Sequence, residues 1–160
     1  MQVTVMMGSD SDLRIIKEVC GLLTKFGVDF EAHIMSAHRT PNDLLDYIKH
    51  CESKGCRVYI CAAGKAAHLA GITASHTIRP VIGIPISTSF MGLDSLLSTS
   101  QMPNGVPVAT VGVDSGANAA LLALQILALL DEKIQKKLVE YREELANAVR
   151  EQDKNLSKWL

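Results

Sequence analysis

The sequence is poor in aromatic residues: three phenylalanines, three tyrosines and one tryptophan make up 4% of its 160 residues. So few rings cannot form the stacking platform on which many nucleic-acid-binding proteins place unpaired bases. Charge of one sign is not concentrated either, because 16 basic and 17 acidic side chains are spread along the chain and leave a net charge of -1. A basic patch that would bind nucleic acid or an anionic membrane is therefore not expected, and a small molecule is the favoured ligand.

Long apolar runs and paired cysteines are missing as well. No apolar stretch reaches the ~18 residues of a membrane-spanning helix, and the first residues lack the charged and then apolar pattern of a secretory signal. The four cysteines include no C-x-x-C pair, and the five-residue gaps between Cys51, Cys56 and Cys61 are a poor zinc pattern. We expect a cytoplasmic protein with reduced cysteines in its core and with neither a metal nor a cofactor.

What the sequence has in quantity is aliphatic residues and alanine, within a hydrophobic content of 48%. This composition is typical of α/β proteins with a buried parallel sheet, and the length suits one domain. Short apolar runs alternate with segments of helical periodicity, which predicts one doubly wound α/β domain, a three-layer αβα fold of flavodoxin-like type. The strands are expected at 2–7, 28–35, 57–62, 81–86 and 106–111, and the helices at 13–26, 41–51, 66–75 and 92–99.

Residue types at the ends of two predicted helices support these assignments. Gly27 suits the position just after a helix, where the backbone is left-handed. Thr40 followed by Pro41 offers an N-cap hydroxyl and a proline at the first helical position. Both helices should therefore have sharp ends.

The C-terminal part of the chain is predicted to be helical and to need a covering surface. Ala117 to Leu130 is apolar on every helical face, and such a helix must be buried all round. From Asp131 onward the pattern is amphipathic. We expect a single catalytic domain over 1–160, with an α/β core at 1–130 and a helical tail at 131–160 that packs on its own or a neighbouring subunit. The apolar stripe of the tail consists of Ile134, Leu138, Tyr141, Leu145 and Val149.

Three segments with unusual polar residues follow the first three predicted strands. They read "GSDSD" at 8–12, "SAHRT" at 36–40 and "AAGKAAHLAG" at 62–71. In an open parallel sheet, ligands bind beyond the carboxyl ends of the strands, where loops lead into helices. The three segments therefore predict one site at this edge of the sheet.

The first of these segments has the residues of a phosphate-binding turn. Gly8 allows a tight turn, the hydroxyl of Ser9 and nearby amides suit a phosphate, and the carboxylate of Asp12 could accept hydrogen bonds from ribose hydroxyls. Serine and aspartate are also ordinary helix caps, so capping alone is an alternative. The segment matches neither the Walker A loop nor the G-x-G-x-x-G dinucleotide pattern.

The second and third segments add groups that can move protons and bind anions. His38 has a side chain suited to proton transfer near neutral pH, and Arg39 beside it could bind a phosphate with two hydrogen bonds. A solvated surface turn is the alternative for this pair. Gly64 permits close approach of a ligand to backbone amides, while Lys65 and His68 could add polar contacts; His68 could equally be a structural residue.

A further segment could close over such a site. Residues 87–89 and 92–107 follow the fourth predicted strand and are rich in serine and glycine. Plain loop chemistry explains the same residues, so both interpretations stay open.

Taken together, the motifs resemble those of the N5-carboxyaminoimidazole ribonucleotide mutases, which are also described as catalytic subunits of phosphoribosylaminoimidazole carboxylase. The resemblance covers about residues 3–130. It rests on six motifs in order: "MGSDSD", "SAHRTP", "AAHLAG", "PVIGIPI", "GLDSLLSTSQMPNGVPVATV" and "ANAALLALQIL". Six ordered motifs are specific at the family level, whereas any one alone would be weak.

The resemblance implies an isomerase of purine biosynthesis that moves a carboxylate from the exocyclic nitrogen to ring carbon 4 of an aminoimidazole ribonucleotide, without ATP or metal. It also implies a homo-octamer, with sites where subunits meet, and a possible transient contact with the ATP-dependent enzyme that makes the substrate. By motif position His38 is the proton carrier. The implied substrate-binding residues are Ser9, Asp12 and Arg39 for the 5-phosphate end, Ser36 in the wall, and Gly64, Lys65, Ala66 and His68 near the ring and the migrating carboxylate.

Three positions depart from the mutase pattern: Ala62 and Lys65 stand where these mutases usually have glycine, and Leu13 stands where they usually have tryptophan. A related branch, the aminoimidazole ribonucleotide carboxylases that use free carbon dioxide, tends to carry a basic residue at the position of Lys65. We expect the mutase reaction, with the carboxylase as the alternative. Two further alternatives are a non-catalytic nucleotide-binding module, which would have no use for His38, and a receiver-type signalling domain, which would need an acidic residue where this chain has Ala62 to Gly64.

Overall fold

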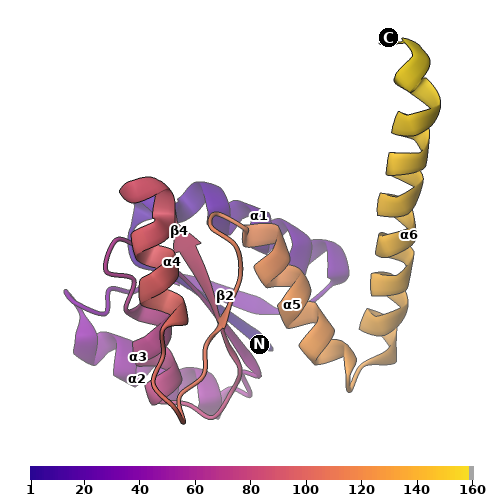
Figure 1. Cartoon of the computed structure of the whole chain (residues 1–160). Coiled ribbons are helices and arrows are strands. Elements are labelled where there is room, and N and C mark those ends of the chain that lie inside the picture. Colours follow the sequence, from indigo (N-terminus) through magenta and orange to yellow (C-terminus); the bar gives the residue numbers. More distant parts are fainter. Residues whose placement is uncertain (159–160) are drawn as a thin grey trace. The chain divides into compact units, whose positions relative to one another are not determined.

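The computed structural model describes residues 1–158 of the chain (Figure 1). The chain divides into two compact units, one from Met1 to Ala123 and one that begins at Leu124. The first unit holds the whole sheet and most of the helices. The predicted α/β core, by comparison, extends to residue 130, and a single catalytic domain over the whole chain stays a prediction.

The first unit is built on a five-stranded parallel sheet in the order β2-β1-β3-β4-β5. This is the order of the flavodoxin-like doubly wound sheet, so the predicted fold class is confirmed. The chain begins in the middle of the sheet, moves outward to β2, and then returns past β1. The strands are β1 Val3–Met7, β2 Phe30–Ile34, β3 Val58–Gly64, β4 Val81–Ile86 and β5 Ala109–Thr110.

Helices cover both faces of this sheet (Figure 1). A Cβ added at Gly116 would lie 2.6 Å from the carbonyl oxygen of Ile15, so the start of α5 contacts α1 on one face. On the other face, Met6 and Tyr59 of the sheet share a core cluster with Leu44 of α2 and Leu69 of α3. The helices are α1 Leu13–Phe26, α2 Pro41–Ser53, α3 Leu69–Ser75, α4 Leu93–Ser100, α5 Gly116–Ala128 and α6 Glu132–Asn155, with short 3-10 turns at Asp10–Asp12, Phe90–Gly92 and Leu156–Lys158.

The three inner strands, β1, β3 and β4, are largely buried because their side chains alternate between these two covered faces, whereas the edge strand β2 is half-buried to exposed. Every residue of β1 and of β4 is buried, including Thr4, whose hydroxyl lies 3.2 Å from the sulfur of Cys56. Such continuous apolar strands are typical of a parallel sheet between two helical layers. The core of the protein therefore consists mainly of aliphatic side chains, as the composition predicts.

Both predicted helix ends lie at the predicted residues, but the predicted capping hydrogen bond of Thr40 is not formed. Gly27 has a left-handed φ of 73° and closes α1 as predicted. Thr40 occupies the N-cap position of α2, but its hydroxyl does not cap the helix. Instead it donates to the carbonyl oxygen of Ser36 and accepts from the backbone N–H of Ser36. The Thr40 hydroxyl therefore stabilises the polar turn before α2 and does not cap the helix as predicted.

Two predicted elements are shorter than the sequence pattern suggests. The strand expected over 106–111 is a two-residue β5, because Pro107 has no N–H to donate to the sheet and the chain before it turns at Gly105, where φ is 97°. The helix expected from Ala66 begins at Leu69. Lys65 has a left-handed φ of 56°, and the N–H of His68 donates back to the carbonyl of Ala66, so these residues form a tight turn.

The second unit consists of the last turn of α5, α6 and a short 3-10 turn. The helix predicted over 117–130 ends at Ala128, and Leu129 and Leu130 are 81% and 84% exposed, so these two leucines are not buried as predicted. Their N–H groups close a tighter turn, and the carboxylate of Asp131 then caps α6 through the N–H groups of Lys133 and Ile134.

The amphipathic tail is a helix, as predicted, and its apolar stripe is exposed in part, with Leu138 and Tyr141 half-buried. Ile134 is buried, whereas Leu145 and Val149 are 50% and 64% exposed. The last two residues of the predicted tail lie outside the described residues. Within residues 1–158, no helix is both long enough and apolar enough to cross a membrane. Packing of this stripe on a neighbouring subunit stays a prediction.

Candidate functional site

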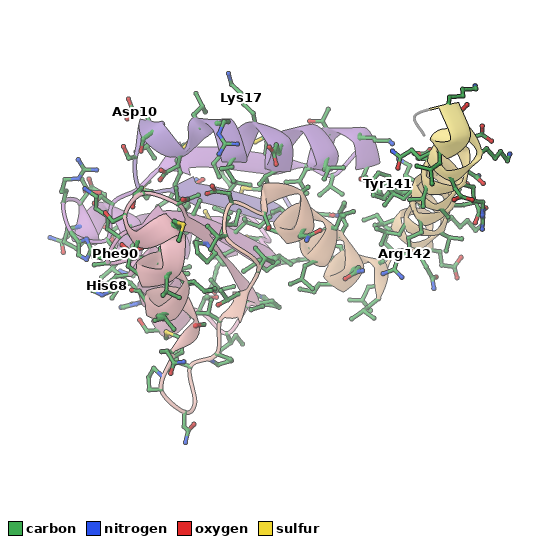
Figure 2. The ribbon with its side chains drawn as sticks, turned by 45° about the horizontal axis from the view of Figure 1, so that its top comes forward. Asp10, Lys17, His68, Phe90, Tyr141 and Arg142 are labelled. Carbon is green, nitrogen blue, oxygen red and sulfur yellow. The ribbon has the colours of Figure 1, made fainter. Side chains whose placement is uncertain are left out.

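A cavity of about 570 Å³ lies at the carboxyl edge of the sheet, between the loops that follow β1, β2, β3 and β4. Figure 2 shows Asp10 and His68 at this end of the first unit, although the two residues belong to loops after different strands. All nine predicted site residues line the cavity: Ser9, Asp12, Ser36, His38, Arg39, Gly64, Lys65, Ala66 and His68. The structure thus brings the three predicted segments together, while the role of each residue stays a prediction.

His38 and His68 come from different loops and lie in contact with each other in the cavity. Nε2 of His38 lies 2.7 Å from Nδ1 of His68, and the two rings meet edge to face with centroids 4.8 Å apart. At this distance one nitrogen donates and the other accepts, so the two facing nitrogens hold one hydrogen between them. The pair can therefore take up or release a proton at a fixed place in the cavity.

Arg39 is held against the ends of the first two strands. Its Nη2 donates to the carbonyl oxygen of Gly8 at 3.0 Å, and its Nε donates to the hydroxyl of Ser36 at 3.4 Å. The hydroxyl of Ser36 also accepts the backbone N–H of Arg39 at 3.1 Å. These bonds orient a permanent positive charge along the cavity wall, which is what an anionic ligand requires.

The turn after β1 places hydroxyl groups and a buried carboxylate in the cavity. The Ser9 hydroxyl donates to Asp10 and accepts the backbone N–H of Ser11, so Ser9 does cap the 3-10 turn Asp10–Asp12. Capping and ligand binding are thus compatible here. Burial raises the pKa of the Asp12 carboxyl above its usual value, and the hydrogen bond from the Ser11 hydroxyl opposes that shift.

The turn after β3 forms another wall of the cavity. A Cβ added at Gly64 would lie 2.8 Å from Cγ2 of Thr88, so the absence of a side chain at Gly64 lets the chain after β4 approach the end of β3 closely. Lys65 follows in the left-handed conformation, with an exposed side chain on the cavity rim. A glycine would adopt this backbone conformation without strain, and lysine pays for it, as non-glycine residues at functional sites often do.

Thr88 and several small or apolar residues also line the cavity, although the sequence analysis did not assign them a role. Thr88 belongs to the segment that was expected either to close over the site or to be a plain loop. Because β4 lies beside β3 in the sheet, the residue that follows β4 reaches the loop that follows β3. Strand order would have revealed this contact, but local sequence does not. The other lining residues without a predicted role are Ser11, Ala37, Ala63 and Leu69, and Gly8, predicted to allow the tight turn, lines the cavity as well.

Cysteines and further histidines lie apart from this cavity. Cys51, Cys56 and Cys61 are buried free thiols, as predicted, and Cys20 is a half-buried one. Burial raises the pKa of the Cys61 thiol to about 12, which keeps it protonated and unreactive. Across residues 1–158, no cluster of three or more His, Cys, Asp or Glu side chains is arranged to hold a metal ion.

Comparison with known proteins identifies the family. Residues 2–148 match the protein family described as AIRC, AIR carboxylase. The chain belongs to the AIR carboxylase family. Its curated relatives include an N5-carboxyaminoimidazole ribonucleotide mutase of Methanocaldococcus jannaschii, 49% identical over 96% of each chain. A Pyrococcus horikoshii protein of the same name is 52% identical over 96% of this chain and 88% of that one.

A solved AIR carboxylase family structure has the same fold. The crystal structure of Treponema denticola PurE superimposes with a TM-score of 0.89 at 32% sequence identity, covering 97% of this chain and 98% of that one. The family resemblance drawn from the six sequence motifs is therefore confirmed.

Proposed function

We propose that this chain is an N5-carboxyaminoimidazole ribonucleotide mutase of purine biosynthesis, an isomerase that needs neither a metal nor a cofactor. The names of its close relatives support the reaction. The observation that carries the proposal is the facing pair of His38 and His68 in the same cavity as Arg39. The reaction requires the protein to transfer a proton and to bind an anion.

The substrate is expected to bind with its 5-phosphate toward the first two loops. Ser9, Asp12 and Arg39 would hold the ribose 5-phosphate end, with Ser36 in the wall beside them. The oriented guanidinium of Arg39 supports this direction, because it donates to the carbonyl of Gly8 at the start of the turn after β1. Gly64, Lys65, Ala66 and His68 would then lie near the imidazole ring and the migrating carboxylate.

The chemistry requires one bond to break, one to form, and one proton to move. The bond between the exocyclic nitrogen and its carboxyl carbon breaks, the nitrogen gains a proton, and carbon dioxide is released inside the cavity. Ring carbon 4 then attacks carbon dioxide and afterwards loses its own proton. His38 would give the first proton and take the second, with His68 sharing it between the steps. Small residues such as Ala66 allow the close packing that prevents escape of carbon dioxide.

A second candidate is carboxylation of aminoimidazole ribonucleotide by free carbon dioxide. Lys65 favours it, because a cation on the cavity rim could attract the carboxylate that forms. The backbone at Lys65 is left-handed, a conformation that glycine would adopt without strain. The names of the close relatives favour the mutase.

One assay separates the two candidates. The purified protein is given the N5-carboxylated nucleotide or, separately, aminoimidazole ribonucleotide with carbon dioxide, at matched concentrations. Formation of 4-carboxy-5-aminoimidazole ribonucleotide is followed in both. Preference for the carbamate supports the mutase, preference for free carbon dioxide supports the carboxylase, and activity on neither would overturn both and favour a nucleotide-binding module.

A variant of His38 tests the proposed mechanism. His38→Asn keeps a polar side chain but removes the proton carrier, so turnover should fall by at least about a hundredfold while nucleotide still binds. Turnover is measured by the same assay and binding by titration calorimetry. A variant that turns over at the wild-type rate would contradict the role of His38.

The assembly and location of the protein are also proposals. We expect a homo-octamer with α6 packed on a neighbouring subunit, which the exposed apolar stripe of that helix supports. A transient contact with the ATP-dependent enzyme that makes the substrate would protect an unstable carbamate. The free thiols at Cys51, Cys56 and Cys61 are compatible with the predicted cytoplasmic location.

A further inference from the structure

Asp114, in the loop between β5 and α5, has an unusual backbone conformation. Its φ is 56°, in the left-handed region that few residues other than glycine, asparagine and aspartate adopt. This conformation turns its carbonyl toward the start of α5, where it accepts the N–H of Gly116 at 3.0 Å. The carbonyl is therefore directed away from β4.

The side chain of Asp114 makes the contact with β4 that its carbonyl does not make. The N–H of Asp114 donates to the carbonyl of Pro85 at 2.9 Å, and the N–H of Ser87 donates to Oδ1 of Asp114, also at 2.9 Å. In a parallel ladder, a residue donates to one residue of its neighbour and accepts, through its carbonyl, from the residue two positions further on. Asp114 reproduces this pattern with a carboxylate oxygen in place of the carbonyl oxygen.

The two hydrogen bonds between Asp114 and the end of β4 form a bracket, which holds the part of the chain that forms one wall of the cavity. Ser87 directly precedes Thr88, and Thr88 approaches Gly64 so closely that no Cβ fits between them. Both Thr88 and Gly64 line the cavity, whereas Asp114 is not among its lining residues. Asp114 can therefore act on a bound ligand through Ser87 and Thr88, and also through its charge, which adds to the effect of burial in raising the pKa of the Asp12 carboxyl.

Neighbouring contacts restrain the bracket further. Nη2 of Arg14, in the first turn of α1, lies 3.6 Å from Oδ2 of Asp114. Val113 packs closely on the turn after β4, since a Cβ added at Gly92 would lie 2.5 Å from Cγ1 of Val113. The loop that carries Asp114 is thus fixed to α1 and to the β4 turn, as a rigid support requires.

We propose that Asp114 is a positioning residue, whose carboxylate replaces a strand carbonyl and fixes Thr88 against Gly64 at the reacting end of the cavity. The placing of the reacting end rests on the proposed function. Since Thr88 and Gly64 lie away from the expected phosphate contacts, loss of the bracket should lower kcat more than it raises KM.

Two substitutions separate the hydrogen bond from the backbone conformation. Asp114→Gly adopts the left-handed backbone without strain and removes the acceptor. Asp114→Asn tolerates the same backbone, keeps an acceptor oxygen for Ser87 and removes the charge. We measure kcat and KM with the N5-carboxylated nucleotide, the stoichiometry of product binding by calorimetry, and amide hydrogen exchange of residues 87–89.

For Asp114→Gly we expect kcat about tenfold lower, because a small misplacement of reacting groups is costly. Exchange at the Ser87 amide should be about tenfold faster, with an unchanged number of nucleotides bound per chain. Asp114→Asn should stay close to wild type in all three measurements. The unchanged stoichiometry distinguishes mispositioning from a loss of folded protein.

The inference would be overturned by an Asp114→Gly variant with wild-type kcat and wild-type exchange at Ser87. It would also be overturned if Asp114→Asn lost as much activity as Asp114→Gly, since charge rather than the acceptor would then matter. If the wild-type protein turns over neither nucleotide, the proposed function fails, and the exchange comparison by itself decides whether Asp114 holds Ser87.

Discussion

The candidate site depends on a few side chains that are oriented by contacts within the protein. Arg39 is directed by the carbonyl of Gly8 and the hydroxyl of Ser36, and His38 is directed by His68. Gly8 and His68 belong to other loops than the residues they orient, whereas Ser36 precedes Arg39 in the same loop, so the orientation of both groups depends in part on the folded sheet edge. Side chains held in this way need little reorganisation when an anionic nucleotide binds.

At the residue scale, Asp12 provides a prediction of pH dependence. Burial raises the pKa of its carboxyl in the folded protein, so the unfolded chain releases this proton at lower pH. The stabilising contribution of this group is complete below the unfolded pKa of about 3.9 and is lost as pH rises through the raised folded value. Asp12→Asn should therefore gain stability relative to wild type as pH rises above about 4 and through the raised folded pKa, as urea unfolding at several pH values would measure.

The same variant should bind nucleotide about tenfold more weakly, because a hydrogen bond to a charged group is replaced by a neutral one. Asp29→Asn, on the exposed loop before β2, is the control and should change neither quantity. A stability difference between Asp12→Asn and wild type that is constant with pH would contradict the raised pKa.

At the scale of elements, the close packing of helix on sheet controls where the loops of the site begin. The turn that reaches Gly64 follows β4. Gly83 of β4 has no side chain, which lets α4 pack closely on this strand. A Cβ added at Gly83 would lie 2.3 Å from Cγ2 of the buried Thr99 and 3.3 Å from the Cβ of Ala70. The Thr99 hydroxyl donates to the carbonyl of Ser95 at 2.7 Å, which fixes its rotamer.

Gly83→Ala is therefore expected to destabilise the protein by about 1–3 kcal/mol, because the extra methyl group overpacks a region that cannot relax easily. Gly21→Ala is the matched control. It adds the same methyl group in the middle of α1, where nothing lies within 4 Å, and should stabilise the protein by up to about 1 kcal/mol. Denaturant unfolding of both variants measures the difference, and equal effects of the same sign would contradict this account of the packing.

At the scale of the whole molecule, α6 is the element whose apolar surface is least explained by the single chain. Leu145 and Val149 are largely exposed on a helix that otherwise carries many charges. Exposed apolar stripes of this kind are usually buried in an assembly. The proposed octamer would account for the stripe, because neighbouring subunits would cover it.

Charges placed on this stripe should disrupt the assembly. Leu145→Glu combined with Val149→Glu is expected to produce smaller species in light scattering, because buried charges without partners oppose association. Lys136→Gln, on the opposite side of α6, changes the charge in the same direction and should leave the assembly intact. An unchanged molecular mass for the double variant would show that α6 does not hold the subunits together.

The sequence by itself determined the class of fold, the sheet edge that carries the site and the family. Apolar runs of strand length, alternating with helical periodicity, indicated a parallel doubly wound sheet, and topology then required the segments at 8–12, 36–40 and 62–71 to meet at one edge. The apolar runs, the helical periodicity and the polar residues of each segment are local properties, since each depends on residues close together in the chain. For the same reason the end of α1 at Gly27 was predictable.

Only the tertiary structure decided which groups touch. The facing of His38 and His68, the approach of Thr88 to Gly64 and the substitution of the Asp114 carboxylate for a strand carbonyl each join residues from separate loops. Thr40 illustrates the limit of local patterns, because its hydroxyl could cap α2 or bond to Ser36, and the folded loop selected the second. Contacts between distant parts of the chain depend on strand order and on small differences in packing distance. No short sequence pattern encodes either of them.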